Sequence, residues 1–182
     1  EDQWRLIYAL TNTGDRLAAG TYQGRIRYTV EAGGVTTDYD FMLRVIVARI
    51  FTLDLDFPEN GIYFSKLLPG APPQTHAVDV RVNSNLGKPY VVWQKSNGLL
   101  RNDENEDLKK EHFLVKVILS ETTIGREAFP EFAPVPEGET PIFFSDEKGS
   151  PAEFEVQYRV EPYMDMSPGD YRTEMTFTLS EI

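Results

Sequence analysis

The chain contains no cysteine and only two histidines among its 182 residues. Without a thiol there is no thiolate zinc site, no cysteine nucleophile and no disulfide bond. His76 and His112 lack the His-x-x-x-His or His-x-His spacing that aims two imidazoles at one metal ion. We therefore interpret both histidines as surface residues, and we expect no cofactor and no dependence of folding on a metal.

Positive charge and long apolar runs are also scarce. The formal net charge is -11 and the sequence pI is about 4.6, so most of the surface repels nucleic-acid phosphates and anionic membranes. The longest apolar stretch, residues 41–48, is far shorter than the roughly 20 residues of a membrane helix and contains Arg44. We predict no nucleic-acid partner and no direct insertion into a membrane. Residues 1–3 are typical of an interior cut, so we expect the sequence to begin within a longer protein.

Motifs for catalysis are missing as well. The chain has no Gly-x-Ser-x-Gly sequence and no glycine-rich phosphate loop. Asp54 and Asp56 alternate with apolar residues, which places both carboxylates on one face of a strand. Paired carboxylates serve acid/base chemistry when one of them lies in an apolar pocket, and no neighbouring residues mark such a pocket. We interpret the pair as the solvent-facing side of a strand, and we expect no enzymatic activity.

The densest group of oxygen ligands is the segment 102–107. An EF-hand loop needs Gly at its sixth position and Glu at its twelfth, but counting from Asp103 these positions hold Leu108 and Leu114. The EF-hand match therefore fails. We expect a solvated loop, and an irregular calcium site is the alternative.

Apolar residues recur with period two through most of the chain, which predicts strands with one buried face. The alternation is clearest in residues 78–82 and 154–160. Turn-forming segments rich in glycine, proline and asparagine separate the runs, a pattern typical of an antiparallel sandwich. Leu108 and His112 stand four apart and indicate a short helix or helical turn near 103–112. The four prolines of 127–141 predict an extended loop that crosses between sheets.

The same strand pair occurs twice. Residues 4–10 and 19–30 match residues 154–160 and 168–179 in their alternation and in the polar connection between them. We place a module boundary near Arg49. On this interpretation residues 1–48 are the C-terminal strands of a first β-sandwich module and residues 49–182 a complete second one. The alternative is a single large sandwich.

Each second strand of the repeat opens with Gly-x-Tyr: Gly20 precedes Tyr22, and Gly169 precedes Tyr171. Glycine tolerates a positive φ in the turn, and a tyrosine entering a buried strand can return its hydroxyl to the backbone, as in a tyrosine corner. We therefore expect both turns to be structural, and both segments to be equivalent strands with the tyrosine packed inward.

The two segments, Ala-Gly-Thr-Tyr and Pro-Gly-Asp-Tyr with the alternating strands that follow, resemble the closing strand of bacterial pilin-like and spore-coat-U-like modules. The likeness covers residues 19–30 and 168–179, and the cysteine pair common in pilins is missing. The resemblance implies an all-β, immunoglobulin-like antiparallel β-sandwich. It also implies a structural or adhesive module of an exported bacterial surface or fimbrial protein, located outside the cell, at its surface or in the periplasm.

The partners that this resemblance implies are protein subunits of a surface assembly, bound through sheet edges. The second copy of the repeat lacks the strand that follows the first, so we expect the edge at 171–179, or the edge left open by the missing start of the first module, to accept a strand from a neighbouring subunit. The alternative function is carbohydrate binding, with Trp93, Tyr90 and Tyr63 as a stacking surface. Against this alternative, residues 90–93 are typical of a central strand, and a core tryptophan between two sheets is the commoner arrangement.

Overall fold

The structure is a computed structural model that describes residues 5, 7, 9, 17–58, 62–96 and 99–182. Within these residues the secondary structure is β except for one 3-10 turn, η1, at Lys110–His112, and every sheet is antiparallel. The chain divides into two compact units, Glu1–Arg49 and Ile50–Ile182. None of the described helices is long and apolar enough to cross a membrane.

The first unit contains one long hairpin, formed by β1 (Gly20–Ala32) and β2 (Val35–Val47), which pair from Gly20 with Val47 to Ala32 with Val35. Gly33 and Gly34 connect the strands, with φ angles of 61° and 79°. Two consecutive positive φ angles are required by the two-residue turn that fits the twist of a hairpin, and glycine adopts them without a steric cost. The strand predicted over residues 4–10 falls largely outside the described residues.

One face of the hairpin is apolar and the other is polar. The register places these apolar residues on the same face: Tyr22, Ile26, Tyr28, Val30, Tyr39, Phe41, Leu43 and Val45. On the polar face Arg25 and Arg27 bind the carboxylate of Asp40 and hold its pKa below the usual value. The apolar face stays exposed or half-exposed in the part of the chain that is described, with Phe41 54% exposed.

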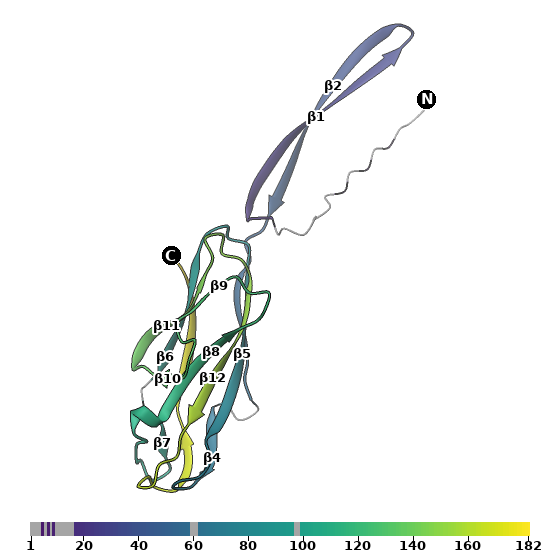
Figure 1. The fold of residues 1–182 in the computed structure, drawn as a ribbon. Helices are drawn as coiled ribbons and strands as arrows, with labels where there is room; N and C mark the ends of the chain where they lie inside the picture. Colours follow the sequence, from purple (N-terminus) through teal and green to yellow (C-terminus); the bar gives the residue numbers. More distant parts are fainter. Residues whose placement is uncertain (1–4, 6, 8, 10–16, 59–61, 97–98) are drawn as a thin grey trace. The chain divides into compact units, whose positions relative to one another are not determined.

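The second unit contains three sheets (Figure 1). The five-stranded sheet has the order β10 (Ala133–Pro134), β8 (Phe113–Leu119), β12 (Ala152–Val160), β5 (Gln74–Ser84) and β3 (Phe51–Asp56). The four-stranded sheet has the order β14 (Met175–Glu181), β6 (Tyr90–Ser96), β11 (Gly138–Ser145) and β9 (Gly125–Glu127). A small sheet joins β4 (Tyr63–Leu67), β13 (Gly169–Arg172) and β7 (Arg101–Asn102).

The two larger sheets pack face to face over one apolar core. Alternate residues of the central strands are fully buried, as the period-two pattern predicts, and Val78, Val80 and Val82 of β5 are at most 2% exposed. Phe143 of β11 stacks on Phe154 of β12 with ring centroids 4.8 Å apart. These cross-sheet contacts show that one continuous core holds the unit together.

Three sequence expectations about local structure have different outcomes. The short helix or helical turn predicted near 103–112 is present as a 3-10 turn at Lys110–His112. The extended segment at 127–141 does change sheets, because β9 and β11 belong to the four-stranded sheet and β10 to the five-stranded one. The second copy of the repeat, expected to form one strand over 168–180, is divided at Thr173 and Glu174 into β13 and β14, which lie in different sheets.

Candidate functional site

The two Gly-x-Tyr turns have the same local geometry. Tyr22 donates its hydroxyl hydrogen bond to the carbonyl oxygen of Ala18 at 2.8 Å, and Tyr171 donates to Ser167 at 2.7 Å. Each acceptor therefore lies four residues before its tyrosine. The preceding glycines also agree, with φ angles of 157° at Gly20 and 152° at Gly169. The two segments adopt the same corner, which is the geometry expected of a tyrosine corner.

The two tyrosines differ in burial. Tyr171 is 1% exposed, and burial raises the pKa of its hydroxyl. Tyr22 is 41% exposed. The expectation that both rings pack inward is therefore wrong for Tyr22, because its ring belongs to the hairpin face that no described residue covers.

The Tyr171 corner is tied to a neighbouring strand through Asp170. The carboxylate of Asp170 accepts hydrogen bonds from the hydroxyl of Tyr63 and from the backbone N–H of Lys66, the latter at 2.7 Å. These donors hold the pKa of Asp170 below its usual value, and the same hydrogen bond raises the pKa of Tyr63. Tyr63, expected as a stacking residue, thus has its hydroxyl committed to the structure of the corner.

The strand after this corner, β14, is an edge strand. In the described part of the chain it pairs with β6 alone, from Met175 opposite Ser96 to Glu181 opposite Tyr90. Strand β13, in contrast, lies between β4 and β7. The open edge expected over residues 171–179 is therefore restricted to β14, because Tyr171 and Arg172 are already paired on both sides.

The inner face of β14 completes the core only in part. Met175, Phe177 and Leu179 pack against the core but remain half-buried, while Thr176 and Thr178 on the opposite face are exposed. On the adjacent strand β6, the inward-facing side chains of Val92 and Gln94 are at most 1% exposed. Burial thus falls off at this edge of the four-stranded sheet.

The edge strand of the other large sheet, β3, lies on the same side. Phe51, Leu53 and Leu55 pack half-buried against the core, and Asp54 and Asp56 are exposed, as the alternation predicts. The ring of Phe57, directly after β3, meets the ring of Phe177 at 6.1 Å between centroids. The edges of both sheets therefore meet along β3 and β14, and we call this side the β3–β14 edge.

The opposite side is closed by the segment that changes sheets. After β9, the backbone N–H of Ala128 donates to Ile142 at 2.9 Å, and the N–H of Val117 donates to Phe129 at 2.8 Å. These hydrogen bonds join one strand of each large sheet to the connecting segment. Of the two sides of this core, the β3–β14 edge is the one that ends in long strands unpaired on one side by any described residue.

The remaining aromatic candidates have unequal exposure. Tyr90 is fully buried and donates its hydroxyl to the carbonyl of Ser150 at 2.8 Å, so it cannot contact a ligand. Trp93 is half-buried and donates its indole N–H to the hydroxyl of Ser180 at 2.8 Å. The interpretation of Trp93 as a core residue between the sheets is wrong, because alternation along β6 puts it on the face opposite Val92 and Gln94.

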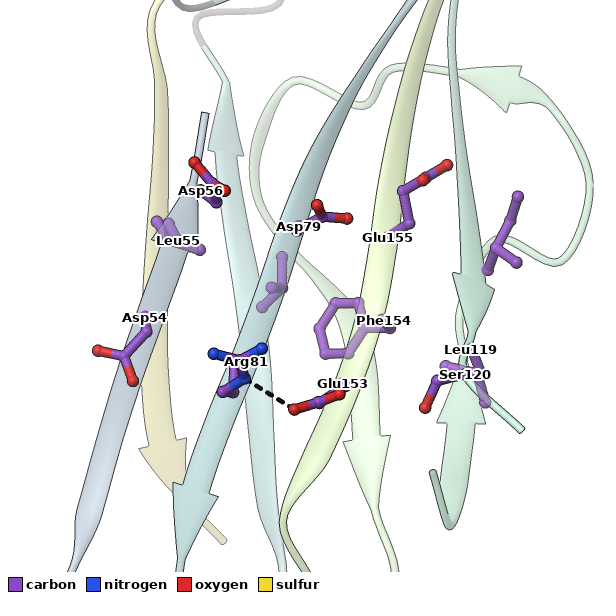
Figure 2. Close-up of a pocket in the computed structure, with 12 residues that line it drawn as sticks. Asp54, Leu55, Asp56, Asp79, Arg81, Leu119, Ser120, Glu153, Phe154 and Glu155 are labelled. Carbon is purple, nitrogen blue, oxygen red and sulfur yellow. Dashed lines mark hydrogen bonds and ion pairs between the residues drawn. The ribbon is translucent and has the colours of Figure 1, made fainter. Parts of the chain in front are cut away.

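A shallow depression of 450 Å³ lies on the five-stranded sheet and is lined by acidic and apolar residues (Figure 2). Its carboxylates come from Asp54, Asp56, Asp79, Glu153 and Glu155. Arg81 donates to Glu153 at 2.7 Å, which raises the pKa of Arg81, and both side chains are more than half exposed. The lining contains no histidine, cysteine or lysine, and its polar groups are these carboxylates, the guanidinium of Arg81 and the hydroxyl of Ser120.

Neither histidine stands free on the surface. His76 packs against the ring of Phe64 at 4.9 Å, and His112 stacks on Tyr163 at 4.4 Å. Both are half-buried, so their interpretation as simple surface residues is wrong. Each ring fills a gap at the margin of the core.

In the 102–107 loop, the side-chain oxygen of Asn102 is already occupied by hydrogen bonds within the loop. Asn102, 5% exposed, accepts hydrogen bonds from the backbone N–H of Glu104 at 3.0 Å and of Glu106 at 2.8 Å. Arg101 binds Asp107, and Arg172 lies 3.4 Å from Asp103. Among the described residues, no three His, Cys, Asp or Glu side chains are placed to hold a metal ion.

No family model, curated protein or solved structure matches this chain. The β3–β14 edge is therefore described from its geometry alone, and the sequence predicts only the β14 part of it. The alternation in 175–179 indicates a strand, but the contribution of β3 to the same edge depends on sheet order. Phe57 continues the alternation of Leu53 and Leu55 that indicates an apolar strand face, but its contact with Phe177 depends on the order of the sheets.

Proposed function

We propose that this chain is a non-enzymatic structural or adhesive module of an exported bacterial surface or fimbrial protein, and that it binds other protein subunits through its sheet edges. The observation that carries the proposal is β14, an edge strand with a half-buried apolar face and a free side. Such a strand offers unpaired N–H and C=O groups to an incoming strand.

Before its last residue, the charged Glu181, β14 lacks the features that protect edge strands from pairing. Natural edges are interrupted by proline, lysine, inward charges or bulges. Residues 175–180 contain no charged residue, no proline and no glycine. Strand β3 carries Asp54 and Asp56 and is followed by Pro58, so β14 is the less protected of the two edges.

We further propose that the second unit is an immunoglobulin-like sandwich and that residues 1–48 are the closing strands of a preceding module. The sheet order β3-β5-β12-β8 facing β14-β6-β11 supports the first statement. The shared corner of Tyr22 and Tyr171, together with the uncovered apolar face of the β1–β2 hairpin, supports the second. The resemblance to pilin-like modules supports a location outside the cell, at its surface or in the periplasm.

The state of association tests the proposed use of the edge. The full chain is studied by native mass spectrometry and light scattering over a range of concentrations, beside Thr176→Pro, whose ring hinders pairing along β14. We expect concentration-dependent association of the wild-type chain that the variant reduces. A strictly monomeric chain that is unaffected by Thr176→Pro would refute this use of the edge.

Glu121→Pro is the matched control. Glu121 is exposed and occupies the second position of the turn in which the N–H of Thr123 donates to Ser120, where proline is favoured. This variant introduces the same residue away from the β3–β14 edge. It should associate like the wild-type chain, and circular dichroism shows whether both variants stay folded.

Carbohydrate binding is a second candidate function, and the observation that favours it is the position of Trp93 on the outer face of β6. A half-buried indole with its N–H held by Ser180 presents a fixed ring for stacking on a sugar. Tyr90 contributes nothing to this surface because it is buried. Titration with a panel of oligosaccharides, followed by tryptophan fluorescence in wild type and Trp93→Ala, tests this candidate, and an unchanged signal would exclude it for that panel.

A further inference from the structure

We propose that the apolar face of the β1–β2 hairpin packs face to face on the same face of a second copy of this chain, with the two hairpins antiparallel. The inference goes beyond the proposed function, because it assigns a partner to the first unit and does not involve the β3–β14 edge. The face consists of seven pairs of directly opposite residues, from Gly20 and Val47 at the open end to Ala32 and Val35 at the turn. We call these seven pairs the hairpin face.

The hairpin face needs a covering layer. A two-stranded hairpin by itself is marginally stable in water, and an apolar face packed on a second layer is what stabilises it. Along this face Tyr39 is 50% exposed and Leu43 is 44% exposed, although both side chains alternate as buried residues do. A continuous exposed apolar surface of this kind is typical of an interaction site.

The distribution of charge favours a second copy as the cover. None of the seven pairs contains a charged side chain, while Arg25, Arg27 and Asp40 interact on the opposite face. Residues 1–49 hold six acidic and six basic side chains, so the whole net charge of -11 belongs to residues 50–182. Two copies therefore repel each other through their second units and can meet without repulsion at the hairpin face.

The sizes of the side chains along the hairpin face are self-complementary. Phe41 and Ile26 form the middle pair. One pair nearer the open end, Gly24 has no side chain, and a dent of 230 Å³ lies there. One pair nearer the turn, Tyr28 lies opposite Tyr39. In an antiparallel stack with its two-fold axis at the middle pair, Gly24 of each copy faces Tyr28 of the other, so that a large ring meets a dent twice.

The parallel stack is the other two-fold arrangement, and it fits less well. It sets Tyr28 of each copy against Tyr39 of the other, which crowds four rings at one level. The chain continues from Val47 into the second unit, so in a parallel stack both chains leave at the same end. Two units with a net charge of -11 each would then follow side by side, whereas an antiparallel stack sends them to opposite ends.

The size of the hairpin face predicts a weak dimer. Two strands of 13 residues each give a face about 44 Å long and about 10 Å wide, from the usual rise per residue and strand spacing. Two stacked faces cover about 900 Å² as flat areas, and the relief of the side chains adds to this. That is at the lower end of specific interfaces, which begin at about 1,200 Å². We expect a reversible dimer that dissociates on dilution, so that the dilute chain has this face uncovered.

Opposite charges of one substitution position test the contact. Sedimentation velocity of the full chain over a range of concentrations compares wild type with Phe41→Glu, at the centre of the hairpin face, and Met42→Glu. Met42 is 71% exposed on the opposite face, so it is the matched control one residue away. We expect Phe41→Glu to raise the dissociation constant of the dimer at least tenfold and Met42→Glu to leave it within about twofold. Equal effects of the two variants would overturn the proposal.

Single cysteines test the antiparallel arrangement without placing a charge on the face, because the chain contains no cysteine of its own. The proposed stack puts Thr37 of one copy opposite Val45 of the other. The same residue of the two copies is then about 27 Å apart along the strands, whereas stacked sheets lie about 10 Å apart. With a thiol cross-linker that spans about 10 Å, a mixture of Thr37→Cys and Val45→Cys chains should cross-link at least tenfold faster than either variant alone.

Other results of this experiment would overturn the proposal. Val45→Cys chains that cross-link with themselves as fast as with Thr37→Cys chains would indicate the parallel stack, and no cross-linking in any mixture would exclude a dimer through this face. The rival cover is another segment of the same chain. A chain that stays monomeric at every concentration, and whose thermal midpoint falls with Phe41→Glu but not with Met42→Glu, would show that rival cover.

The proposed use of β14 is judged separately with Thr176→Pro. Introduced into the Thr37→Cys and Val45→Cys chains, this substitution should leave their cross-linking unchanged. Loss of the cross-link in folded Thr176→Pro chains would show that the copies meet through β14, which would overturn the hairpin contact and support the edge. An unchanged cross-link, together with association that Thr176→Pro does not reduce, would support the hairpin contact and refute the use of the edge.

Discussion

The ring of Phe57 meets the ring of Phe177 in an edge-to-face contact, with 6.1 Å between centroids. Phe57 follows the edge strand of the five-stranded sheet, and Phe177 lies on the edge strand of the four-stranded sheet. The contact therefore links the two sheets at the side where burial falls off. Phe177 therefore packs against the core from an edge strand and is only half-buried there.

Replacing Phe177 should destabilise the second unit moderately. A fully buried phenylalanine costs about 3–5 kcal/mol when replaced by alanine. Since Phe177 is half-buried, we expect Phe177→Ala to lower the free energy of unfolding by about 2 kcal/mol, measured by urea unfolding. Thr178→Ala, on the exposed face of the same strand, is the control and should change it by less than about 0.5 kcal/mol. Equal effects of the two substitutions would contradict the orientation of β14.

The Asp170 contacts predict a pH dependence. The hydrogen bonds from Tyr63 and from the N–H of Lys66 lower the pKa of Asp170 in the folded chain. A carboxyl group with a lowered folded-state pKa stabilises the fold above its unfolded pKa, and this contribution disappears as the pH falls through the folded pKa. Asp170→Asn should therefore be less stable than wild type at about pH 6, and the gap should narrow towards about pH 2.

Thermal unfolding at a series of pH values measures the difference in stability between Asp170→Asn and wild type. Asp79→Asn is a suitable control, because Asp79 is an exposed residue of β5 outside the Asp170 hydrogen-bond group. The difference in thermal midpoint between Asp79→Asn and wild type should not narrow at low pH as it does for Asp170→Asn. A gap for Asp170→Asn that stays constant between about pH 6 and pH 2 would show that the charge on this carboxylate does not stabilise the corner.

The sequence predicts a structural feature well when a local pattern of residues determines it, and poorly when the order of strands in the sheets determines it. Residues 154–160 alternate cleanly because β12 lies between two strands with one face on the core, so the pattern reports its environment directly. Trp93 shows the limit of this argument. Its size indicates burial, but only the alternation of its neighbours along β6 shows that it faces away from the core.

Two other local features depend on tertiary contacts and not on the local sequence. Neither Thr173 nor Glu174 is a glycine or proline that would mark the change of sheet between β13 and β14. The spacing of Leu108 and His112 indicates a short helix or helical turn, and only the 3-10 turn at Lys110–His112 forms, because Leu108 is buried next to a loop whose N–H groups are held by Asn102. Long-range hydrogen bonds and burial decide both cases, and local propensity does not report them.

The 102–107 loop should not depend on a cation. Asn102 already accepts two backbone hydrogen bonds, so the loop is held by its own groups. We expect the thermal midpoint of the full chain to stay unchanged when a chelator of divalent cations is added. A fall of several degrees that added calcium reverses would show instead that an irregular calcium site stabilises this loop.

The two tyrosine corners should contribute unequally to stability. Tyr171→Phe removes the hydroxyl that donates to Ser167 and leaves that acceptor beside a buried ring, which costs about 1 kcal/mol. Tyr22→Phe removes the equivalent hydrogen bond to Ala18, but Tyr22 is 41% exposed and water can replace the hydroxyl. We therefore expect Tyr22→Phe to cost less than half as much in urea unfolding followed by circular dichroism. Equal costs would show that the apolar face around Tyr22 is covered in solution, which would identify the hairpin as a contact surface in the free chain.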